Sequence, residues 1–263
     1  MPEPSLTVVM PSYNAASTIV RSLDSIRSQG RDDVEVVVVD GGSIDGTVEI
    51  LRGRPDVRWV SEPDRGLSDA YNKGAAMARG PVLGWLNADD TYLPGALDAV
   101  VGAFATRPDL VWLTGRCLIV DEKGQEIRAA VTRYKNALLS HYSQRIYLTQ
   151  NFVSAPSTFF RRDTFLDVGG MDLALRYSMD YDLFLRLGRV GPPVVLEQPL
   201  ACFTMAEGTL SMSGFNHQFV EHQQIAARYR ADSPAAYAVN VVASRAIVLA
   251  YRAMRLVRRS SSR

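Results

Sequence analysis

The stretch VEVVVVDGGSIDGT, residues 34–47, decides the fold class. A nearly continuous run of valines is typical of a strand that is buried on both faces of a parallel sheet. The run ends at Asp40, and a Gly-rich turn leads to Asp45-Gly46-Thr47, which predicts a turn and a helix N-terminus, with a helix over 47–52. Strand, turn and helix in this order form one half of a βαβ unit.

The same alternation continues on both sides of this stretch. We expect strands at 6–11, 57–60 and 80–86, and helices at 15–28, 67–78 and 94–106, with Pro94 in the first turn of its helix. Strands separated by helices favour right-handed crossovers, because these pack helices back onto the sheet. The first third of the chain therefore predicts a doubly wound α/β domain.

The second half of the chain is less regular. A strand is expected at 110–120 with a turn near 122–124, followed by helices at 179–189, 214–230 and 234–259 and a short strand at 193–197. The segment 130–160 is rich in Tyr, Gln, Asn and Ser, and we expect loops there that shape a second binding surface. Without repeats or a low-complexity linker, the pattern predicts one domain over 1–213 and a C-terminal helical extension over 214–263.

Charge is distributed unevenly along the 263 residues. The formal net charge is +1, but no acidic residue follows Asp232, whereas six arginines do: Arg245, Arg252, Arg255, Arg258, Arg259 and Arg263. A net acidic body does not resemble a nucleic-acid binder, so we expect no nucleic-acid partner. A basic end can touch an anionic surface.

The location expected from the sequence is the cytoplasm, with contact at the inner face of the membrane left open. Cys117 and Cys202 lie far apart and make no metal-ligand spacing, which favours a reducing compartment. The N-terminus lacks the basic and apolar regions of a signal peptide, and no apolar run reaches about 18 residues.

Polar residues follow each of the first four expected strands. Ligands of open α/β sheets bind outside the carboxyl ends of the strands, so these four ends together predict a site. Tyr13 is either a core aromatic or a ring that stacks on a base, and Asp40 is either a turn former or a nucleoside contact. The four segments are PSYN (11–14), DGGSIDGT (40–47), EPDRG (62–66) and NADD (87–90).

Two adjacent carboxylates, Asp89 and Asp90, end the fourth of these strands. Like charges this close repel, and burying them is costly without a cation. The pair is either a solvated turn or a site where Mg²⁺ or Mn²⁺ is held together with substrate phosphates, and we favour the metal. GxGxxG and GxxxxGK[ST] are absent, which weakens dinucleotide-binding and P-loop interpretations.

The motifs VVMPSYNAAST, VEVVVVDGGSIDGT, SEPDRGLSDAYNKGAAMARG and GWLNADD, in this order, resemble the nucleotide-sugar-dependent glycosyltransferases of family 2, which have the GT-A fold. The resemblance covers roughly 5–205. It implies a Rossmann-like mixed sheet flanked by helices, and inverting transfer of a sugar from a nucleoside diphosphate, UDP favoured. It also implies a divalent metal, Mn²⁺ or Mg²⁺, and a hydroxyl acceptor on a glycan or lipid-linked glycan, as in bacterial cell-surface polysaccharide or glycolipid synthesis.

The resemblance also assigns roles to single residues. It places the nucleotide sugar on 1–108 and the acceptor on 109–213. Asp90 matches the metal ligand, and Asp89 matches the carboxylate that contacts ribose or metal. The remaining positions expected at the nucleotide are Pro11, Tyr13, Asn14, Asp40, Asp64 and Asn87.

A catalytic base is expected in GGMDLALRYSMDYDLFLRL, 169–187. Asp180 matches it, and an inverting displacement independently needs a base on the acceptor side. The alternative is that Asp180 is only an N-terminal helix residue. Asp182 is expected to be structural and would be the next candidate base, followed by Glu207.

This chain departs from the family pattern at three places. Gly41 stands where a second Asp is frequent, Met179 where Glu is frequent, and Ala206 where a His is common. His217 and His222 are expected on a helix surface rather than as replacements for that histidine.

The tail allows two interpretations. On a helix, Arg245, Arg252, Arg255 and Arg259 share one face, and the opposite face carries Val239, Ala246, Ala250, Ala253 and Val257. The helix packs on its own domain or a second copy, or it binds anionic lipid near a lipid-linked acceptor.

Two other function classes remain open. A nucleotidyltransferase shares the sheet but needs a basic phosphate loop, whereas PSYNAAST (11–18) has no Lys or Arg. A non-catalytic sugar-binding relative would not need Asp89, Asp90 and Asp180.

Overall fold

The computed structural model describes residues 3–205 and 215–260, and the side chains of these residues except 215, 216 and 248–260. Ala206 and Glu207, two positions considered above, lie outside the described residues.

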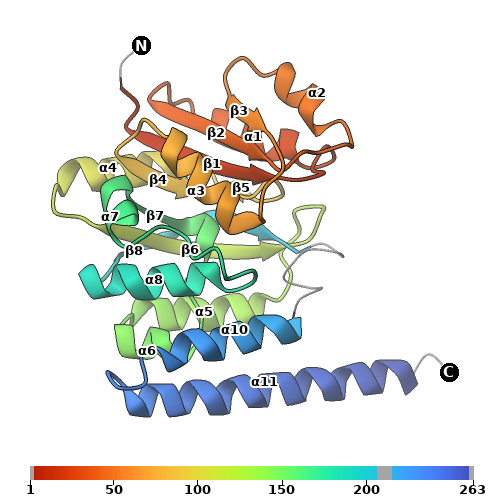
Figure 1. Ribbon diagram of the computed structural model, residues 1–263, viewed down its shortest axis with the longest axis vertical. Coiled ribbons are helices and arrows are strands. Elements are labelled where there is room, and N and C mark those ends of the chain that lie inside the picture. The colour runs from red at the N-terminus through yellow and green to blue at the C-terminus, as the bar shows by residue number, and fades with distance from the viewer. Residues whose placement is uncertain (1–2, 206–214, 261–263) are drawn as a thin grey trace.

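One eight-stranded mixed sheet runs through the molecule in the order β3-β2-β1-β4-β7-β6-β8-β5 (Figure 1). The first four strands in this order are parallel, β7 is antiparallel to both its neighbours, and β6 and β8 are parallel. The α/β prediction is confirmed, and the mixed part of the sheet lies in the second half. The strands are β1 (Leu6–Ser12), β2 (Val34–Asp40), β3 (Arg58–Ser61), β4 (Val82–Trp85), β5 (Thr91–Tyr92), β6 (Trp112–Val120), β7 (Thr158–Arg161) and β8 (Val194–Thr204).

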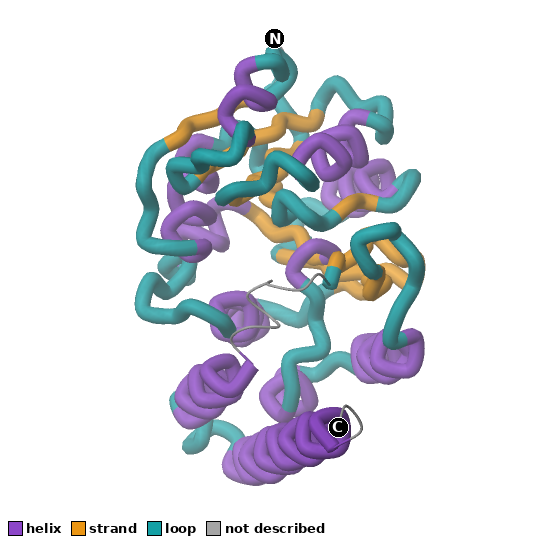
Figure 2. Tube along the Cα trace, turned by 90° about the vertical axis from the view of Figure 1, so that its right-hand side faces the viewer, coloured by secondary structure: helices purple, strands orange, loops and turns teal. Residues whose placement is uncertain are grey.

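Helices cover both faces of the sheet (Figure 2). Buried residues of α1, α2 and α4 pack on one face against Val8 and Met10, and α3, α7 and α8 pack on the other against Val9 and Trp85. Alternate residues of β1 thus enter opposite cores, as the pleat requires. The helices of these layers are α1 (Ile19–Arg27), α2 (Thr47–Arg52), α3 (Leu67–Met77), α4 (Ala96–Thr106), α7 (Arg162–Asp167) and α8 (Met179–Val190).

Helix α3 approaches the sheet unusually closely at Gly74. A Cβ at this position would lie 2.3 Å from Cγ1 of Val9, so no larger residue fits without a shift. This contact holds Tyr71, three residues earlier, near the carboxyl ends of the parallel strands.

The expectation of loops over 130–160 is wrong. This segment forms α5 (Ala129–Ser140), α6 (Gln144–Thr149), the 3-10 turn η1 (Ala155–Ser157) and β7. One of its tyrosines is a core residue: Tyr147 is buried with Tyr181, and its hydroxyl donates a hydrogen bond to Asn151, whereas Tyr134 is half exposed. An aromatic ring with a satisfied hydroxyl packs well, so a polar-looking composition hid ordered helices.

Three element boundaries also differ from expectation. Helix α1 begins at Ile19, because Ala15–Thr18 forms a turn closed by the Thr18 N–H on the Ala15 carbonyl. Pro94 precedes α4, which starts after Gly95 at φ 76°. Strand β8 continues to Thr204 because it pairs with β6 from Leu113 to Val120.

Two helices, α10 (Phe215–Ala227) and α11 (Pro234–Ser260), form the layer farthest from the N-terminal strands (Figure 1). Helix α11 contacts the body through buried Asn240 and Ser244, whereas Val239 and Ala246 are exposed. The described part of the expected apolar face therefore does not pack on its own domain. Along the described residues, no helix combines the length and apolarity needed to cross a membrane.

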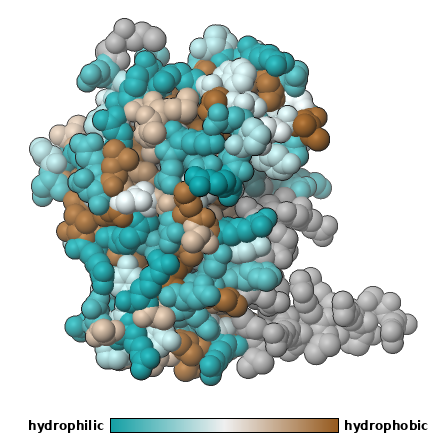
Figure 3. All heavy atoms as spheres, in the orientation of Figure 1, coloured by the Kyte–Doolittle hydropathy of each residue, from teal (hydrophilic) through white to brown (hydrophobic). Residues whose placement is uncertain are grey.

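The face of the molecule seen in Figure 3 mixes hydrophilic and hydrophobic residues. The division of the chain at residue 213 remains a prediction. One continuous sheet joins both halves of 1–213, since β4 of the first half pairs with β7 of the second.

Candidate active site

Asp40 organises the turn after β2. Its Oδ2 accepts hydrogen bonds from the Gly42 and Ser43 N–H groups and from the Ser61 hydroxyl, and its Oδ1 accepts one from the Ser43 hydroxyl. The side chain is fully buried. Asp40 therefore shapes the loop beneath the expected nucleotide site and presents no oxygen at the surface.

Hydrogen bonds from side chains connect the neighbouring loops at this edge of the sheet, where the sequence predicted these residues. Asn14, at φ 48°, receives the Ile44 N–H on Oδ1, and its own N–H donates to the Ser43 hydroxyl. Asp45 accepts the Thr47 N–H and hydroxyl and the Ala16 N–H, so its predicted role in the turn is confirmed, although Gly46 rather than Asp45 is the N-cap residue of α2. Pro11 is buried within β1.

Tyr13 and Asp64 flank Gly41 at the exposed rim of this edge. The Tyr13 ring is 66% exposed, which excludes its role as a core aromatic. A Cβ at Gly41 would lie 2.7 Å from Oδ2 of Asp64 and 3.4 Å from Cδ2 of Tyr13. The Asp64 carboxylate thus occupies the place into which a side chain at position 41 would extend, and the Gly66 N–H holds it there.

Asp89 and Asp90 have different surroundings. Asp90 is fully buried, and its Oδ1 accepts the Thr204 N–H at 2.8 Å while its Oδ2 accepts the Asn87 amide at 3.0 Å. Asp89 is half-buried. Burial raises the pKa of the Asp90 carboxyl well above its ordinary value, with the Asp89 charge adding to it, and burial also raises the pKa of Asp89. Within the described residues, neither carboxylate has an ion-pair partner.

Tyr71 from α3 is hydrogen-bonded to the segment that carries Asp89 and Asp90. Its hydroxyl donates to Oδ1 of Asn87 at 2.7 Å, and its ring stacks on Trp85 at 4.4 Å between centroids. Its pKa is raised well above 10 by burial and then by the charges of Asp90, Asp180 and Asp89. Asn87 in turn donates to Oδ2 of Asp90, so hydrogen bonds link Tyr71 to Asp90, while the charges of Asp89 and of Asp180, which comes from a distant part of the chain, also act on this hydroxyl.

Asp180 sits in the first turn of α8, and its charge acts on the Tyr71 hydroxyl. Its Oδ2 accepts the Asn151 amide at 3.0 Å, and its Oδ1 accepts the Tyr181 N–H at 2.8 Å. Burial raises the pKa of the Asp180 carboxyl, although these hydrogen bonds oppose the rise. A carboxylate with a raised pKa is suited to accept a proton near neutral pH.

Sequence reasoning missed Lys135, which α5 brings into the same region. Its Nζ donates to the Ser154 hydroxyl at 3.2 Å. Burial lowers its pKa, while Asp180 is among the charges that raise it. No motif marks this lysine, because α5 itself was not predicted.

Two further side chains near α8 have clear outcomes. Asp182 is buried and paired with Arg186 and Arg228, so its predicted structural role is confirmed. His222 is 7% exposed and packs against the Tyr181 ring at 3.9 Å, so its expected surface position is wrong. His217 is exposed, as expected.

The N-terminus of α8 is also held from α10. Glu221 accepts the N–H groups of Arg176, Tyr177 and Ser178, the three residues that lead into the helix. The extension therefore contributes to the placement of Asp180. In the described part of the chain, no three His, Cys, Asp or Glu side chains gather to form a metal site of their own.

The sequence model of the family described as "Glycosyl transferase family 2" matches residues 7–169, well over half of the chain. The chain belongs to this family. The match includes the four strand ends, Asp89 and Asp90, whereas Asp180 lies beyond it.

Individual relatives agree with this membership. A chondroitin synthase of Escherichia coli is 29% identical over 201 residues, which cover 72% of this chain and 27% of that protein. The chain thus spans about a quarter of that relative's length.

Two solved structures have a similar fold. Staphylococcus aureus TarS 1–349 with UDP-GlcNAc gives a TM-score of 0.65 at 19% identity, covering 87% of this chain and 73% of that one. The mannosyltransferase PcManGT of Pyrobaculum calidifontis, with GDP-Man and Mn²⁺, gives 0.67 at 21% identity, covering 97% and 81%. The GT-A fold of this family 2 chain is thereby established.

Proposed function

We propose that this family 2 glycosyltransferase chain transfers a sugar, with inversion, from a nucleoside-diphosphate sugar to a hydroxyl acceptor. The observation that carries the proposal is the hydrogen-bonded series from the Tyr71 hydroxyl through Asn87 to Asp90, next to Asp89, together with the charge of Asp180 that also acts on Tyr71. Two of these carboxylates end the fourth parallel strand and the third opens a helix from the other half. This arrangement suits a diphosphate on one side of the reacting carbon and a base on the other.

For the nucleoside, we propose Tyr13 and Asp64 as the direct contacts. Tyr13 offers an exposed ring for stacking, and the Asp64 carboxylate stands beside it in the space left by Gly41. Asn14 and Asp40 then act through the loop that they hold. Pro11 acts through the backbone of β1, and Asn87 acts through its hydrogen bond to Asp90. Among the neighbours in fold, TarS was solved with UDP-GlcNAc and PcManGT with GDP-Man, which supports a nucleotide-sugar donor, with UDP favoured here.

For the metal, we propose Asp89 as the direct ligand in place of Asp90. Both oxygens of Asp90 already accept hydrogen bonds and none is exposed, whereas Asp89 is open on one side. Mg²⁺ and similar ions are commonly held by one or two carboxylates and by substrate phosphates, so this pair fits such an ion. A bound ion would offset the cost of two buried like charges and the charge of the leaving diphosphate.

In the proposed step, Asp180 accepts the proton of the acceptor hydroxyl. The acceptor oxygen forms the new bond to the anomeric carbon as the bond from that carbon to the diphosphate oxygen breaks, and the nucleoside diphosphate leaves. Asn151 and the Tyr181 N–H orient the Asp180 carboxylate for this transfer. Lys135, near Asp180, adds positive charge on the acceptor side of the site.

The outer face of α11 supports a proposal that the protein acts at a lipid surface. Its polar residues Asn240 and Ser244 face the body, while Val242 is 68% exposed. The chain after Asp232 carries six arginines and no acidic residue. An outward apolar face together with arginines matches an anionic membrane, so we propose peripheral binding at the inner leaflet and a lipid-linked glycan acceptor.

Titration calorimetry with UDP, GDP and dTDP tests the donor site. We expect one of them to bind in the presence of Mn²⁺ and more weakly in its absence. Absence of binding by all three, with and without Mn²⁺, would contradict a donor site of this kind. Release of nucleoside diphosphate from a bound donor in water then separates a transferase from a non-catalytic relative.

Flotation with vesicles tests the lipid contact. We expect the chain to float with vesicles containing anionic phosphatidylglycerol and to remain unbound with pure phosphatidylcholine, and Val242→Glu should weaken the binding. Glu49→Gln, which removes an exposed charge far from α11, serves as control. Failure to float, with light scattering that gives a dimer sensitive to Val242→Glu, would assign this face to a second copy instead.

A further inference from the structure

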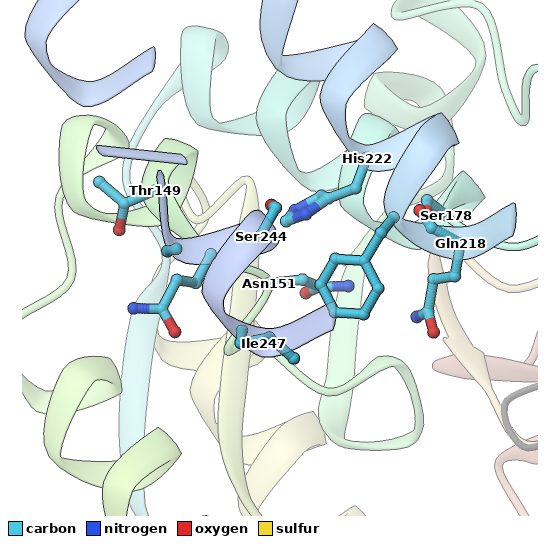
Figure 4. A pocket seen from close by; sticks show the side chains of 10 residues that line it. Thr149, Asn151, Ser178, Gln218, His222, Ser244 and Ile247 are labelled. Carbon is cyan, nitrogen blue, oxygen red and sulfur yellow. The ribbon is translucent and has the colours of Figure 1, made fainter. Parts of the chain in front are cut away.

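A small pocket lies between α6, the start of α8, α10 and α11, and Figure 4 shows the side chains that line it. Its volume is about 140 Å³. Sites for drug-sized ligands usually exceed about 300 Å³, so this pocket suits a single ring rather than a nucleotide.

The lining of the pocket is uncharged and mixes polar groups with a larger apolar surface. Asn151, Ser178, Gln218 and Ser244 contribute amides and hydroxyls, and Phe219 contributes an aromatic ring. No Asp, Glu, Lys or Arg lines it. Such a lining favours a neutral ligand that has both hydroxyl groups and a hydrophobic face, which describes a sugar ring better than a phosphate or a carboxylate.

One buried polar atom in this lining lacks a partner. His222 is more than nine-tenths buried, and its Nε2 makes no hydrogen bond. Burial lowers its pKa to about 4, so the imidazole is neutral near pH 7. An unpaired buried nitrogen is costly, and a ligand hydroxyl in the pocket would remove this cost.

The pocket adjoins the expected base through one side chain. Asn151 lines the pocket, and its amide donates to Oδ2 of Asp180 at 3.0 Å. Ser178, two residues before Asp180, lines it as well. A ring held here would place its own hydroxyls, or those of the next sugar unit, close to the carboxylate.

We infer that this pocket is an acceptor subsite that binds one neutral sugar ring, with His222 as a recognition residue and Phe219 against the apolar face of the ring. The inference rests on the proposed glycosyltransferase function and adds to it the chemical class of the acceptor and the place where it binds.

Saturation-transfer NMR on the full chain, with a panel of neutral methyl glycosides as probes, tests the subsite. We expect at least one glycoside to bind, and His222→Phe, which keeps a ring against Tyr181, to weaken that binding roughly threefold to tenfold because one hydrogen bond is lost. His217→Phe on the exposed side of the same helix is the matched control and should leave binding unchanged.

A second variant fills the pocket. Ala243→Phe places a ring in the lining and should abolish glycoside binding, whereas Ala246→Phe, one turn on and exposed, should not. Hydrolysis of the donor in water should persist in both variants, since the pocket does not hold the donor. Absence of binding by every glycoside, or binding that survives Ala243→Phe, would overturn the subsite. If donor hydrolysis were preserved at the same time, the proposed transferase function would stand.

Discussion

Asp180→Asn and Asp182→Asn together separate chemistry from stability in one turn of α8. The two carboxylates are two residues apart, but Asp180 faces the site while Asp182 is buried between Arg186 and Arg228, with nitrogen to oxygen distances of 2.8 and 3.0 Å. The same chemical change at the two positions therefore has opposite expected effects.

At Asp180 the loss should be in rate. General-base assistance contributes roughly 10²–10⁴-fold, so we expect nucleoside-diphosphate release to fall within this range. The asparagine amide can keep one of the two hydrogen bonds, and the substitution removes a buried charge whose burial raises the pKa of Asp180. The free energy of unfolding should therefore change by no more than about 1 kcal/mol. Donor affinity should remain near that of the unchanged chain.

At Asp182 the loss should be in stability. Removing one partner of a buried ion pair costs about 3–5 kcal/mol, and the half-exposed Arg228 places this case near 3 kcal/mol. At about 2–4 °C for each kcal/mol, the melting temperature should fall by roughly 6–12 °C, while the protein that stays folded remains active.

The assay combines thermal melting, calorimetry of donor binding and release of nucleoside diphosphate in water. Asp180→Asn that retains more than a tenth of the release rate would place the base elsewhere. Asp182→Asn that melts normally but loses release would exchange the roles of the two carboxylates.

Three further outcomes follow from the site and the core. Asp89→Ala should remove the Mn²⁺-dependent part of nucleotide affinity without lowering the melting temperature. Asp90→Ala should in addition destabilise the fold by about 2 kcal/mol, because the Thr204 N–H and the Asn87 amide lose their acceptor. Equal effects of the two variants on nucleotide affinity and on melting temperature would argue against this division of roles. The release rate should fall with decreasing pH through a midpoint above the ordinary range of an aspartate, since burial raises the pKa of Asp180 and the base acts deprotonated; a flat profile down to pH 4 would contradict this role. The pKa of Glu35 is lowered, against the effect of burial, by hydrogen bonds from the Arg79 N–H, Arg58 and Thr7. Glu35 therefore contributes stability that is present at neutral pH and lost as the pH falls through its folded pKa. In calorimetry, Glu35→Gln should lower the melting temperature at pH 7 and make it depend less on acid pH.

Local sequence determined the first half of the molecule. The valine run before Asp40 is typical of a strand that is buried on both faces of a parallel sheet, and each strand there is followed by its helix. The carboxyl ends of parallel strands must meet at one edge, so Tyr13, Asp64 and Asp89 could be assigned to that edge from their positions in the chain. Asp180 could also be placed at the start of a helix from the local sequence pattern.

Tertiary structure alone decided how these residues share the work. Asp89 and Asp90 are neighbours in sequence, but only β8, which brings the Thr204 N–H, buries one and leaves the other open. Lys135 and His222 enter the site region because α5 and α10 pack there, and their amino-acid types look like those of any surface helix. Burial and partner choice depend on contacts between segments that are distant in the chain, and such contacts leave no periodic signal in the sequence around the residue itself.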